Sequence, residues 1–316
     1  MTELESNNDT IQNRFEILFL YDVEEGNPNG DPLNEDRPRM DEETGENIVT
    51  DVRLKRTARD YFIDRYEHEK SNAVFVRSAE KEDGTLKSRE ELVKDELGGA
   101  DTDFDDWTKG DVKDALFKQF LDLRLFGATI AVEDMAIGQP GPVQFKMGRS
   151  LHRVDTRYIQ QSVTLPSEEG AEQGTFADRY DLPYSLIRFH GIINENAAQD
   201  TNLTYDDVHK LADGLWNGTK SLITHSKMEH APVTLLLVEY SEDNFHIGGL
   251  DRLIDIESEK KDEAIRSLSD VTLLTEELER KLSEKSNNIE DIHMISEATH
   301  GFEVEGADTK ELDMKR

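Results

Sequence analysis

The apolar residues of this chain are concentrated in a few short, periodic segments that are separated by long acidic stretches. Residues 13–23 and 232–240 are rich in branched and aromatic side chains, which predicts two strands. Residues 112–126 repeat apolar side chains at helical spacing, which predicts an amphipathic helix. A chain of low hydrophobicity and high net charge builds no core unless its apolar residues are grouped. The grouping therefore predicts a folded protein.

The charge of the chain is strongly unbalanced, with 37 Lys and Arg against 69 Asp and Glu and a formal net charge of −32. Two interpretations compete: an acidic, largely disordered chain, or a folded protein from a cytoplasm at molar salt, where a dense acidic surface keeps proteins dissolved. The periodic segments favour the second. At about 1 M salt the Debye length is only ~3 Å, so surface charge acts over a short range. As a whole-chain number, however, the charge argues against a nucleic-acid partner.

Several classes of protein are excluded by composition. The chain has no cysteine, so it contains no disulfide scaffold, thiol nucleophile or Cys-ligated zinc site. The acidic, polar N-terminus is typical of neither a signal peptide nor a transit peptide. The longest clean apolar run, residues 235–238, is too short to cross a bilayer. We therefore expect a soluble, cytoplasmic protein without a membrane partner, built as one large domain with insertions or as two smaller domains.

Three stretches escape the general excess of acid, and we call them the acid-poor islands: residues 53–59, 141–165 and 214–228. Their basic residues are Arg53, Lys55, Arg56 and Arg59 in the first, Lys146, Arg149, Arg153 and Arg157 in the second, and Lys220 and Lys227 with His225 in the third. For one island alone, internal ion pairing explains the charge about as well as anion binding does. The three together predict a groove for a polyanion.

Strands and helices are expected to alternate along the chain. Besides the segments above, strands are expected at 128–135, 142–146 and 184–194, and helices at 51–62, at 204–224 and, highly charged, at 259–285. Thr50 is the expected N-cap of the helix that starts at residue 51, and Gly127 the expected C-cap after residue 126. Residues 77–111 are interpreted as an exposed insertion, 164–181 as a long loop, and 286–316 as a mobile tail.

Motifs of catalysis or metal binding are scarce. The sequence has no HExxH, GxSxG, Walker A or GxGxxG pattern, and the spacing of His225 and His230 is more typical of a structural role. Asp22 and Asp31 flank the turn at residues 27–31 and could hold Mg²⁺, but Asp is a common turn residue, so a capped turn is favoured. We therefore expect no enzyme activity, no cofactor and no metal site.

Specific strings resemble one known family. They are NPNGDP (27–32), RPR-D-ETG (37–45), VTD-x-x-LKR (49–56), DLRLFGA (122–128), GPVQF followed by GRS (141–150), the segment from Tyr184 to Gly191, and THSK (224–227) before the strand that ends at Tyr240. In this order the strings resemble CRISPR-associated protein family seven, the backbone subunit of type I Cascade complexes in the RAMP superfamily, in its I-B and I-C branch. The resemblance covers roughly residues 13–245. With the acidic charge, it implies a halophilic archaeal source.

The resemblance implies an α+β fold with an RNA-recognition-motif-like (ferredoxin-like) palm, a finger insertion and a thumb hairpin. The implied division is a disordered N-terminus at 1–12, a palm at 13–258 with fingers at about 60–125 and a thumb at about 160–183, and a C-terminal helix and acidic tail at 259–316. The implied function is a CRISPR RNA-binding subunit of an antiviral surveillance complex, which polymerises along the guide and presents it to target DNA. Implied partners are further copies of the chain, a large subunit, a handle-binding RAMP subunit and a processing endoribonuclease.

The acid-poor islands coincide with the matched strings, so the resemblance also implies which residues contact RNA. The candidates are Lys55, Arg56, Arg149, Lys220, His225 and Lys227, with Arg53, Arg59 and Arg153 in support. Asn27, Asn29 and Gly30 are expected to shape the loop below the RNA. An alternative from the same superfamily is an endoribonuclease that cuts target RNA with an acidic loop residue, for which Asp31 is the candidate. A further alternative is an acidic scaffold without any role in RNA binding.

Overall fold

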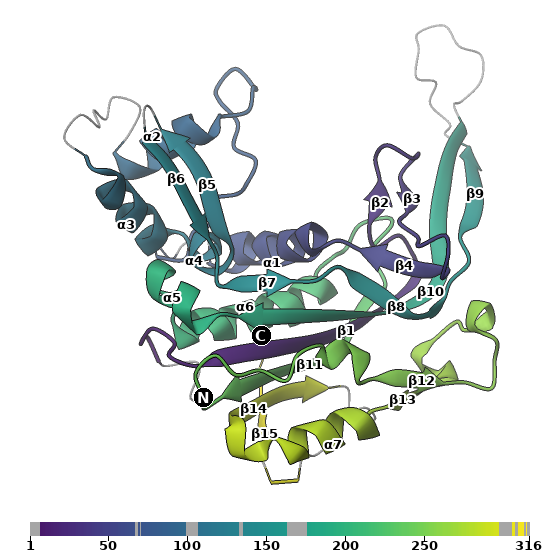
Figure 1. The fold of residues 1–316 in the computed structure, drawn as a ribbon. Helices are drawn as coiled ribbons and strands as arrows, with labels where there is room; N and C mark the ends of the chain where they lie inside the picture. Colours follow the sequence, from purple (N-terminus) through teal and green to yellow (C-terminus); the bar gives the residue numbers. More distant parts are fainter. Residues whose placement is uncertain are drawn as a thin grey trace, which may run out of the picture.

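A computed structural model of the chain describes residues 7–66, 69, 71–98, 107–132, 135–162, 176–296, 305–306, 309–312 and 314. At its centre is a sheet with the strand order β15-β14-β11-β1-β10-β8-β4 (Figure 1). These strands are β1 (Arg14–Gly26), β4 (Glu46–Val49), β8 (Gly148–Arg153), β10 (Phe176–Ile193), β11 (His230–Tyr240), β14 (Ile289–Ser296) and β15 (Thr309–Glu311). β7 (Val143–Phe145) and β9 (Arg157–Ser162) also pair with β10. The pairing is antiparallel except between β14 and β15.

The two central strands β1 and β10 pair from Phe15 opposite Ile193 to Gly26 opposite Leu182, and β11 pairs with the other edge of β1. These three strands correspond to the expected strands at 13–23, 184–194 and 232–240, which are confirmed. Their branched and aromatic side chains alternate between the two faces of the sheet, so each face contributes to a separate core. The sheet with its flanking helices confirms the α+β class.

One face of the sheet is covered by α1 (Asp51–Tyr66) and α6 (Tyr205–Lys220), which pack together. Both helices begin at the expected threonine: Thr50 Oγ1 accepts a hydrogen bond from Arg53 N at 3.2 Å, and Thr204 forms a capping box with Asp207. The helices can approach closely because residue 214 is a glycine: a Cβ there would lie only 2.5 Å from the Phe62 ring. This core fixes the N-terminus of α1 beside the end of β1.

The other face is covered by the C-terminal part of the chain. Leu18, Leu20 and Val238 point into a second core that includes Leu278 and Leu282 of α7 (Glu276–Glu284). The remaining elements here are the hairpin β12 (Asp255–Glu257) and β13 (Thr272–Leu274), with short 3-10 turns at Leu250–Arg252, Asp262–Ala264, Leu268–Asp270 and Ser286–Asn288. The sheet is thus a middle layer with helices on both sides (Figure 1).

A third core lies outside the sheet, in what we call the insertion subdomain. It consists of α2 (Arg89–Leu97), α3 (Lys109–Gln119), α4 (Leu121–Phe126) and the hairpin of β5 (Gly127–Val132) and β6 (Met135–Pro140). Leu92, Val112, Leu116 and Ile130 are buried in it. The insertion subdomain and the β9–β10 hairpin project from the same side of the sheet at its opposite ends (Figure 1). The last elements are α5 (Glu195–Thr201) and the short pair β2 (Gly30–Asp31) and β3 (Arg37–Pro38).

Two expectations about residues 77–126 need correction. The described part of 77–111 is more than an exposed insertion, because Leu92 and Val93 are buried in the third core. The single helix expected at 112–126 is two helices, α3 and α4, broken at Phe120. Phe120 has extended backbone and forms a bridge with Ala73, which ends the first helix. Gly127 caps the second helix as expected. The expected strand at 128–135 is the hairpin of β5 and β6, so only its first half was placed correctly.

The C-terminal region also differs from expectation. The helix expected at 259–285 is confined to Glu276–Glu284, because Ile265 and Val271 reach the second core from short 3-10 turns and extended backbone. The expected mobile tail contains β14, which pairs with β11 from Thr234 to Tyr240. At the N-terminus residues 1–6 lie outside the described residues, but Ile11 is fully buried and its N–H donates to Leu203 O at 3.0 Å. The disorder expected for 1–12 is therefore wrong for the segment around Ile11.

The loop expected at 164–181 is shorter than predicted. Residues 176–181 belong to β10 and pair with β9, while 163–175 lie outside the described residues. The helix expected at 204–224 ends at Lys220. Among the described residues, no helix is long and apolar enough to cross a membrane.

Candidate nucleic-acid interface

Residues from four separate segments meet in a hollow of about 540 Å³ at one end of the sheet, which we call the cationic pocket. The segments are the turn after β1, the first turn of α1, the start of β10 and the stretch between α6 and β11. Of the residues expected to bind RNA or shape the loop, six line the pocket: Asn27, Asn29, Gly30, Arg53, His225 and Lys227. The fold thus joins parts of the first and third acid-poor islands.

Two cations of the pocket, Arg53 and Lys227, contact hydroxyls, although the carboxylates of Glu35, Asp36 and Asp178 also line the pocket. Arg53 Nη2 donates to Thr57 Oγ1 at 3.0 Å, and Lys227 Nζ donates to Ser226 Oγ at 3.1 Å. Within the described part of the chain, neither side chain forms an ion pair. Burial lowers the pKa of both groups; the charge of Arg53 further lowers the pKa of Lys227, and Asp36 offsets part of this effect. Arg53 and Lys227 are partly buried and repel each other, so a bound anion would be stabilised by both and would reduce their repulsion.

The turn after β1 is built around the pocket by its asparagines. Asn29 Oδ1 accepts hydrogen bonds from the backbone N–H and the hydroxyl of Thr50, both at 2.9 Å, and so ties the turn to the N-terminus of α1. Asn27 Nδ2 donates to Asp36 O at 2.6 Å, and Asn27 N donates to Ser226 O at 2.8 Å. A Cβ at Gly30 would lie 2.8 Å from Asp36 O, so the close approach of these backbones requires glycine. These bonds hold the turn against the Ser226 segment.

His230 and Tyr21 lie beside these cations without adding charge. Burial lowers the pKa of His230 to about 3, with Lys227 and Arg53 contributing, so the imidazole is neutral near pH 7. Burial also raises the pKa of Tyr21, and the two rings lie 5.8 Å apart. Neither side chain supplies a counter-charge for Arg53.

Six residues that the sequence analysis did not name also line the pocket: Glu35, Asp36, Asp178, Arg179, Tyr180 and Ser226. Arg179 Nη1 lies 2.9 Å from His225 Nε2, and Arg179 Nη2 donates to Glu25 O at 3.1 Å. The guanidinium of Arg37 lies 4.4 Å from the ring centre of Tyr180. Arg179 and Tyr180 were overlooked because residues 164–181 lack apolar periodicity and were interpreted as a loop. Phe176, Tyr180 and Leu182 all fall at even positions, and this partial alternation was the available signal for a strand.

Most of the other predicted RNA-binding residues pair with carboxylates outside the pocket. The contacts are Lys55 with Asp51 at 3.0 Å, Arg56 with Asp60 at 2.5 Å, Arg59 with Asp122 at 3.0 Å, Arg149 with Asp41 and Glu46 at 2.8 and 2.9 Å, and Arg153 with Glu263 at 3.4 Å. Lys220 lies 5.0 Å from the ring centre of Trp216. Arg149 and Arg153 remain partly exposed. Internal ion pairing, the competing interpretation of the islands, accounts for these five basic residues and their six pairs.

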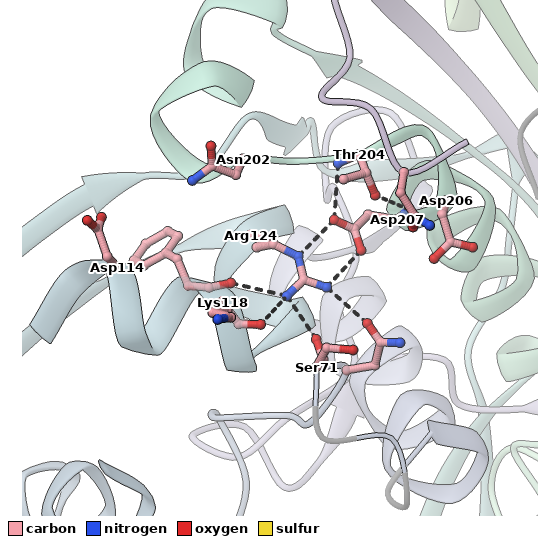
Figure 2. A pocket seen from close by; sticks show the side chains of 11 residues that line it. Ser71, Asp114, Lys118, Arg124, Asn202, Thr204, Asp206 and Asp207 are labelled. Carbon is pink, nitrogen blue, oxygen red and sulfur yellow. Dashed lines mark hydrogen bonds and ion pairs between the residues drawn. The ribbon is translucent and has the colours of Figure 1, made fainter. Parts of the chain in front are cut away.

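The charged residues of the string at 122–128 have structural contacts inside the protein. Asp122 is fully buried and accepts hydrogen bonds from Phe75 N at 2.8 Å, Val76 N at 3.1 Å and Arg59 Nε at 3.0 Å. Arg124 donates to both carboxylate oxygens of Asp207 at 2.8 Å each. Arg124 also donates to Ser71 O, Phe117 O and Asn72 Oδ1. Figure 2 shows Arg124 between Asp207 and Ser71 in a second hollow. The donors of Arg124 are thereby satisfied, and the residue connects α6 to the insertion subdomain.

The fold places the chain in a known structural class. It matches a chain of a CRISPR RNA-guided surveillance complex in a pre-nicking state with a TM-score of 0.52, 10% identity and coverage of 94% of this chain and 96% of that chain. A second CRISPR RNA-guided surveillance complex gives a TM-score of 0.50, 12% identity and coverage of 94% of each chain. The mostly antiparallel α+β fold is therefore that of subunits found in such complexes.

Sequence comparison then gives the family. The family of CRISPR-associated protein Cas7 matches residues 13–276. The CRISPR-associated protein Cas7 of Haloferax volcanii is 34% identical over 308 residues, which cover 91% of this chain and 88% of that protein. The chain belongs to the Cas7 family, as the resemblance in the sequence implied.

Proposed function

We propose that the chain is the RNA-binding backbone subunit of a type I CRISPR surveillance complex and that the cationic pocket holds a phosphate of the guide RNA. Membership in the Cas7 family supports the role of the subunit. The observation that carries the RNA site is the pair Arg53 and Lys227, two partly buried cations hydrogen-bonded to hydroxyls and not to carboxylates. A phosphate oxygen would supply the charge-assisted partner that both lack.

The acidic surface determines how such a site could work. For single strands, log K falls by about 0.7 per phosphate contact for each tenfold rise in salt, so five contacts would cost ~3.5 decades. Released counterions therefore contribute little at molar salt. Donors held in place by the turn, base stacking of about 1–3 kcal/mol per base and contacts to the 2′-hydroxyl must contribute more. We infer that single copies bind RNA weakly and that neighbouring copies bind it cooperatively.

The parts of the fold can be assigned to the palm, fingers and thumb that the family resemblance implies. In this proposal the central sheet with α1 and α6 is the palm, the insertion subdomain belongs to the fingers at about 60–125, and the β9–β10 hairpin belongs to the thumb at about 160–183. Exposed Tyr158 on β9 lies 5.3 Å from Tyr180 on β10, ring centre to ring centre. Such a pair of rings near the pocket is suited to stacking on a displaced base.

The proposed partners follow from this role. They are CRISPR RNA, target DNA that pairs with the guide, further copies of the chain, and the large subunit, handle-binding RAMP subunit and processing endoribonuclease of the same complex. The proposal includes no catalytic residue. In the alternative, Asp31 would cut target RNA, but its Oδ1 accepts Leu33 N at 3.3 Å and lies 3.3 Å from Arg39 Nη2, so this carboxylate already has partners.

The experiment is a titration of single-stranded RNA of increasing length with purified protein at molar KCl. We expect affinity per subunit to rise with the number of copies that an RNA can hold, and to fall at least tenfold in the double variant Arg53→Ala, Lys227→Ala. Arg65→Ala, an exposed residue of the same helix, is the matched control. Tight binding that is independent of RNA length would contradict cooperativity, and an unchanged double variant would contradict the site.

The same preparation tests the endoribonuclease. Complementary RNA is incubated with the protein and Mg²⁺, with Asp31→Ala as the control. The proposal expects intact RNA with both proteins. Cleavage by the unmodified protein that disappears in Asp31→Ala would establish the alternative.

A further inference from the structure

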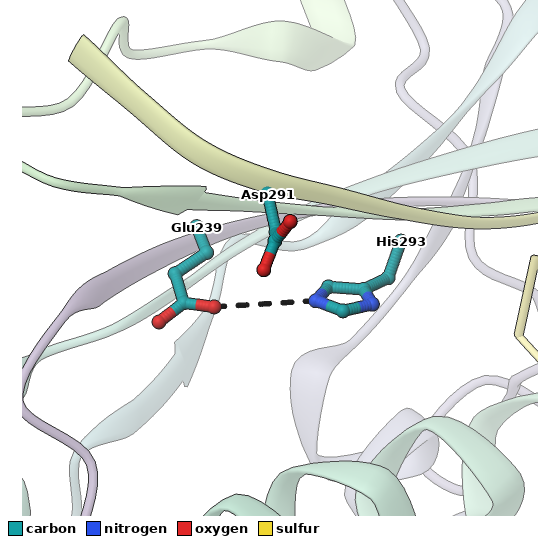
Figure 3. Close-up of side chains that lie close together, drawn as sticks. All are labelled: Glu239, Asp291 and His293. Carbon is teal, nitrogen blue, oxygen red and sulfur yellow. Dashed lines mark ion pairs between the residues drawn. The ribbon is translucent and has the colours of Figure 1, made fainter. Parts of the chain in front are cut away.

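Three potential metal ligands lie together at the far edge of the sheet from β8 and β4, on β11 and β14. Glu239, Asp291 and His293 each offer one ligand atom, and these atoms lie within 4.8 Å of one another (Figure 3). The register explains the cluster: Asp291 lies directly opposite Glu239, and His293 lies two residues further along β14 on the same face. The sequence analysis found no metal-ligand spacing because Glu239 is distant from the other two along the chain.

His293 provides an independent reason to look for a ligand at this cluster. The residue is 1% exposed, and among the described residues neither ring nitrogen has a hydrogen-bond partner. Leaving a buried polar atom unpaired is unfavourable, so such a side chain needs an explanation. Its Nε2 points toward Glu239, whose Oε2 lies 4.0 Å away, which is too long for a hydrogen bond (Figure 3).

The carboxylates are held by neighbours that leave one oxygen of each available. Glu239 Oε1 accepts hydrogen bonds from Asn13 Nδ2 at 2.8 Å and from the Tyr205 hydroxyl at 3.1 Å, and its Oε2 faces His293. Asp291 Oδ2 is held by Lys310 Nζ at 2.9 Å. Hydrogen bonds from an outer shell of this kind orient the ligands of protein metal sites.

We propose that Glu239, Asp291 and His293 bind one divalent transition-metal ion, with zinc or manganese as the fitting class. One imidazole and two carboxylates are a mixed N/O donor set, which these ions accept and which Mg²⁺, with its preference for oxygen ligands and water, does not favour. Ligand atoms at about 2.0–2.2 Å from zinc lie roughly 3.3–3.6 Å apart. Binding therefore requires these side chains to close by less than about 2 Å.

The ion connects β14 to β11 and, through Asn13 and Tyr205, to the start of β1 and to α6. It fastens the C-terminal strands to the central sheet in a chain that has no cysteine for a disulfide. The inference does not depend on RNA binding, because none of the three ligands lines the cationic pocket.

The test uses the purified full-length chain after treatment with nuclease and EDTA, so that no RNA phosphate binds the added metal. Zn²⁺ and Mn²⁺ are titrated by calorimetry at molar KCl, and thermal unfolding is followed with and without metal. We expect one tight site per chain, a rise in the unfolding temperature with Zn²⁺, and an affinity at least about 100-fold lower in His293→Gln and Asp291→Asn. Asp243→Asn and His246→Gln, exposed residues, are matched controls for surface binding and should bind as tightly as the unmodified chain.

Zinc-edge X-ray absorption of the unmodified chain supplies a readout that needs no variant to fold. We expect one imidazole nitrogen and oxygen ligands at about 2.0–2.2 Å. Weak, multiple binding, a metal shell without imidazole, or an unchanged affinity in a folded His293→Gln or Asp291→Asn variant would each overturn the proposal.

Discussion

Arg53 on α1 directs its guanidinium to the hydroxyl of Thr57, at 3.0 Å. Its neighbours on the same helix, Lys55 and Arg56, pair with carboxylates one turn away. In a protein of net charge −32, the lack of a directly contacting carboxylate among the described residues distinguishes Arg53 from Lys55 and Arg56. The contrast is what makes the cationic pocket, and not the whole first island, the proposed site for RNA.

Arg53→Ala should weaken RNA binding at least about tenfold, the loss expected for one charge-assisted bond of about 1.5–3 kcal/mol. It should also make the slope of log K against log salt less steep by about 0.7, since one phosphate contact is lost. Fluorescence anisotropy over a series of KCl concentrations measures both quantities. Arg56→Ala tests the contrast: because Arg56 is exposed and paired with Asp60, its effect should be clearly smaller. Equal effects would remove the distinction between the two residues.

Lys227→Met should change RNA affinity and stability in opposite directions. Without RNA, the variant removes a partly buried ammonium whose pKa is lowered by burial and by Arg53, so the free energy of unfolding should rise. With RNA, the lost contact should lower affinity. Chemical denaturation of the RNA-free protein and RNA titration of the same sample measure the pair of effects. A variant that is less stable and binds normally would indicate a structural lysine.

Asp22 should make stability depend on pH. Burial raises its pKa to about 6 despite a hydrogen bond from the Tyr184 hydroxyl at 3.0 Å. Between about pH 4 and 6 the folded state therefore binds more protons than the unfolded state, and stability falls as pH rises. Asp22→Asn should remove this loss and stabilise the protein by about 1–2 kcal/mol at pH 7, allowing for partial exposure. Below pH 4 the variant should gain nothing; a gain that persists there would assign the effect to another cause.

The Arg124–Asp207 pair should be required for the attachment of the insertion subdomain. Asp207→Ala leaves the buried guanidinium of Arg124 without its bidentate partner and also removes a cap of α6, so we expect a loss of about 3–5 kcal/mol. Denaturant unfolding measures this loss. Asp206→Ala changes the neighbouring residue, which forms a partly exposed ion pair with Lys210 on the same helix, and should cost less than about 1 kcal/mol. RNA affinity of the folded fraction of either variant should stay unchanged, because neither residue lines the cationic pocket.

Sequence patterns predicted the central strands and the starts of α1 and α6, because these depend on local signals. Branched residues mark β1, β10 and β11, and a threonine cap marks each helix. Breaks caused by tertiary contacts were missed: Phe120 leaves the helix to pair with Ala73, and Ile265 reaches the second core from a 3-10 turn. Patterns of charge and of apolar periodicity carry no information about such distant partners.

The candidate site was also predicted only in part. Arg53, His225 and Lys227 were named from acid-poor stretches, yet charge counts gave no way to separate them from Lys55 or Arg149. The carboxylates that pair with Arg59 and Arg149 lie far along the chain, such as Asp122 for Arg59, whereas those of Lys55 and Arg56 lie one turn away on the same helix. The cluster of Glu239 and His293 was invisible for the same reason, because only the β11–β14 register brings these residues together.

The most direct test is to sequence the nucleic acid that purifies with the chain at molar KCl, in parallel for the unmodified protein and for the double variant Arg53→Ala, Lys227→Ala. The account predicts CRISPR RNA with a repeat-derived 5′ handle on the unmodified protein and its loss from the folded double variant. Unmodified protein that carries no RNA, or a double variant that carries the same RNA in the same amount, would contradict it.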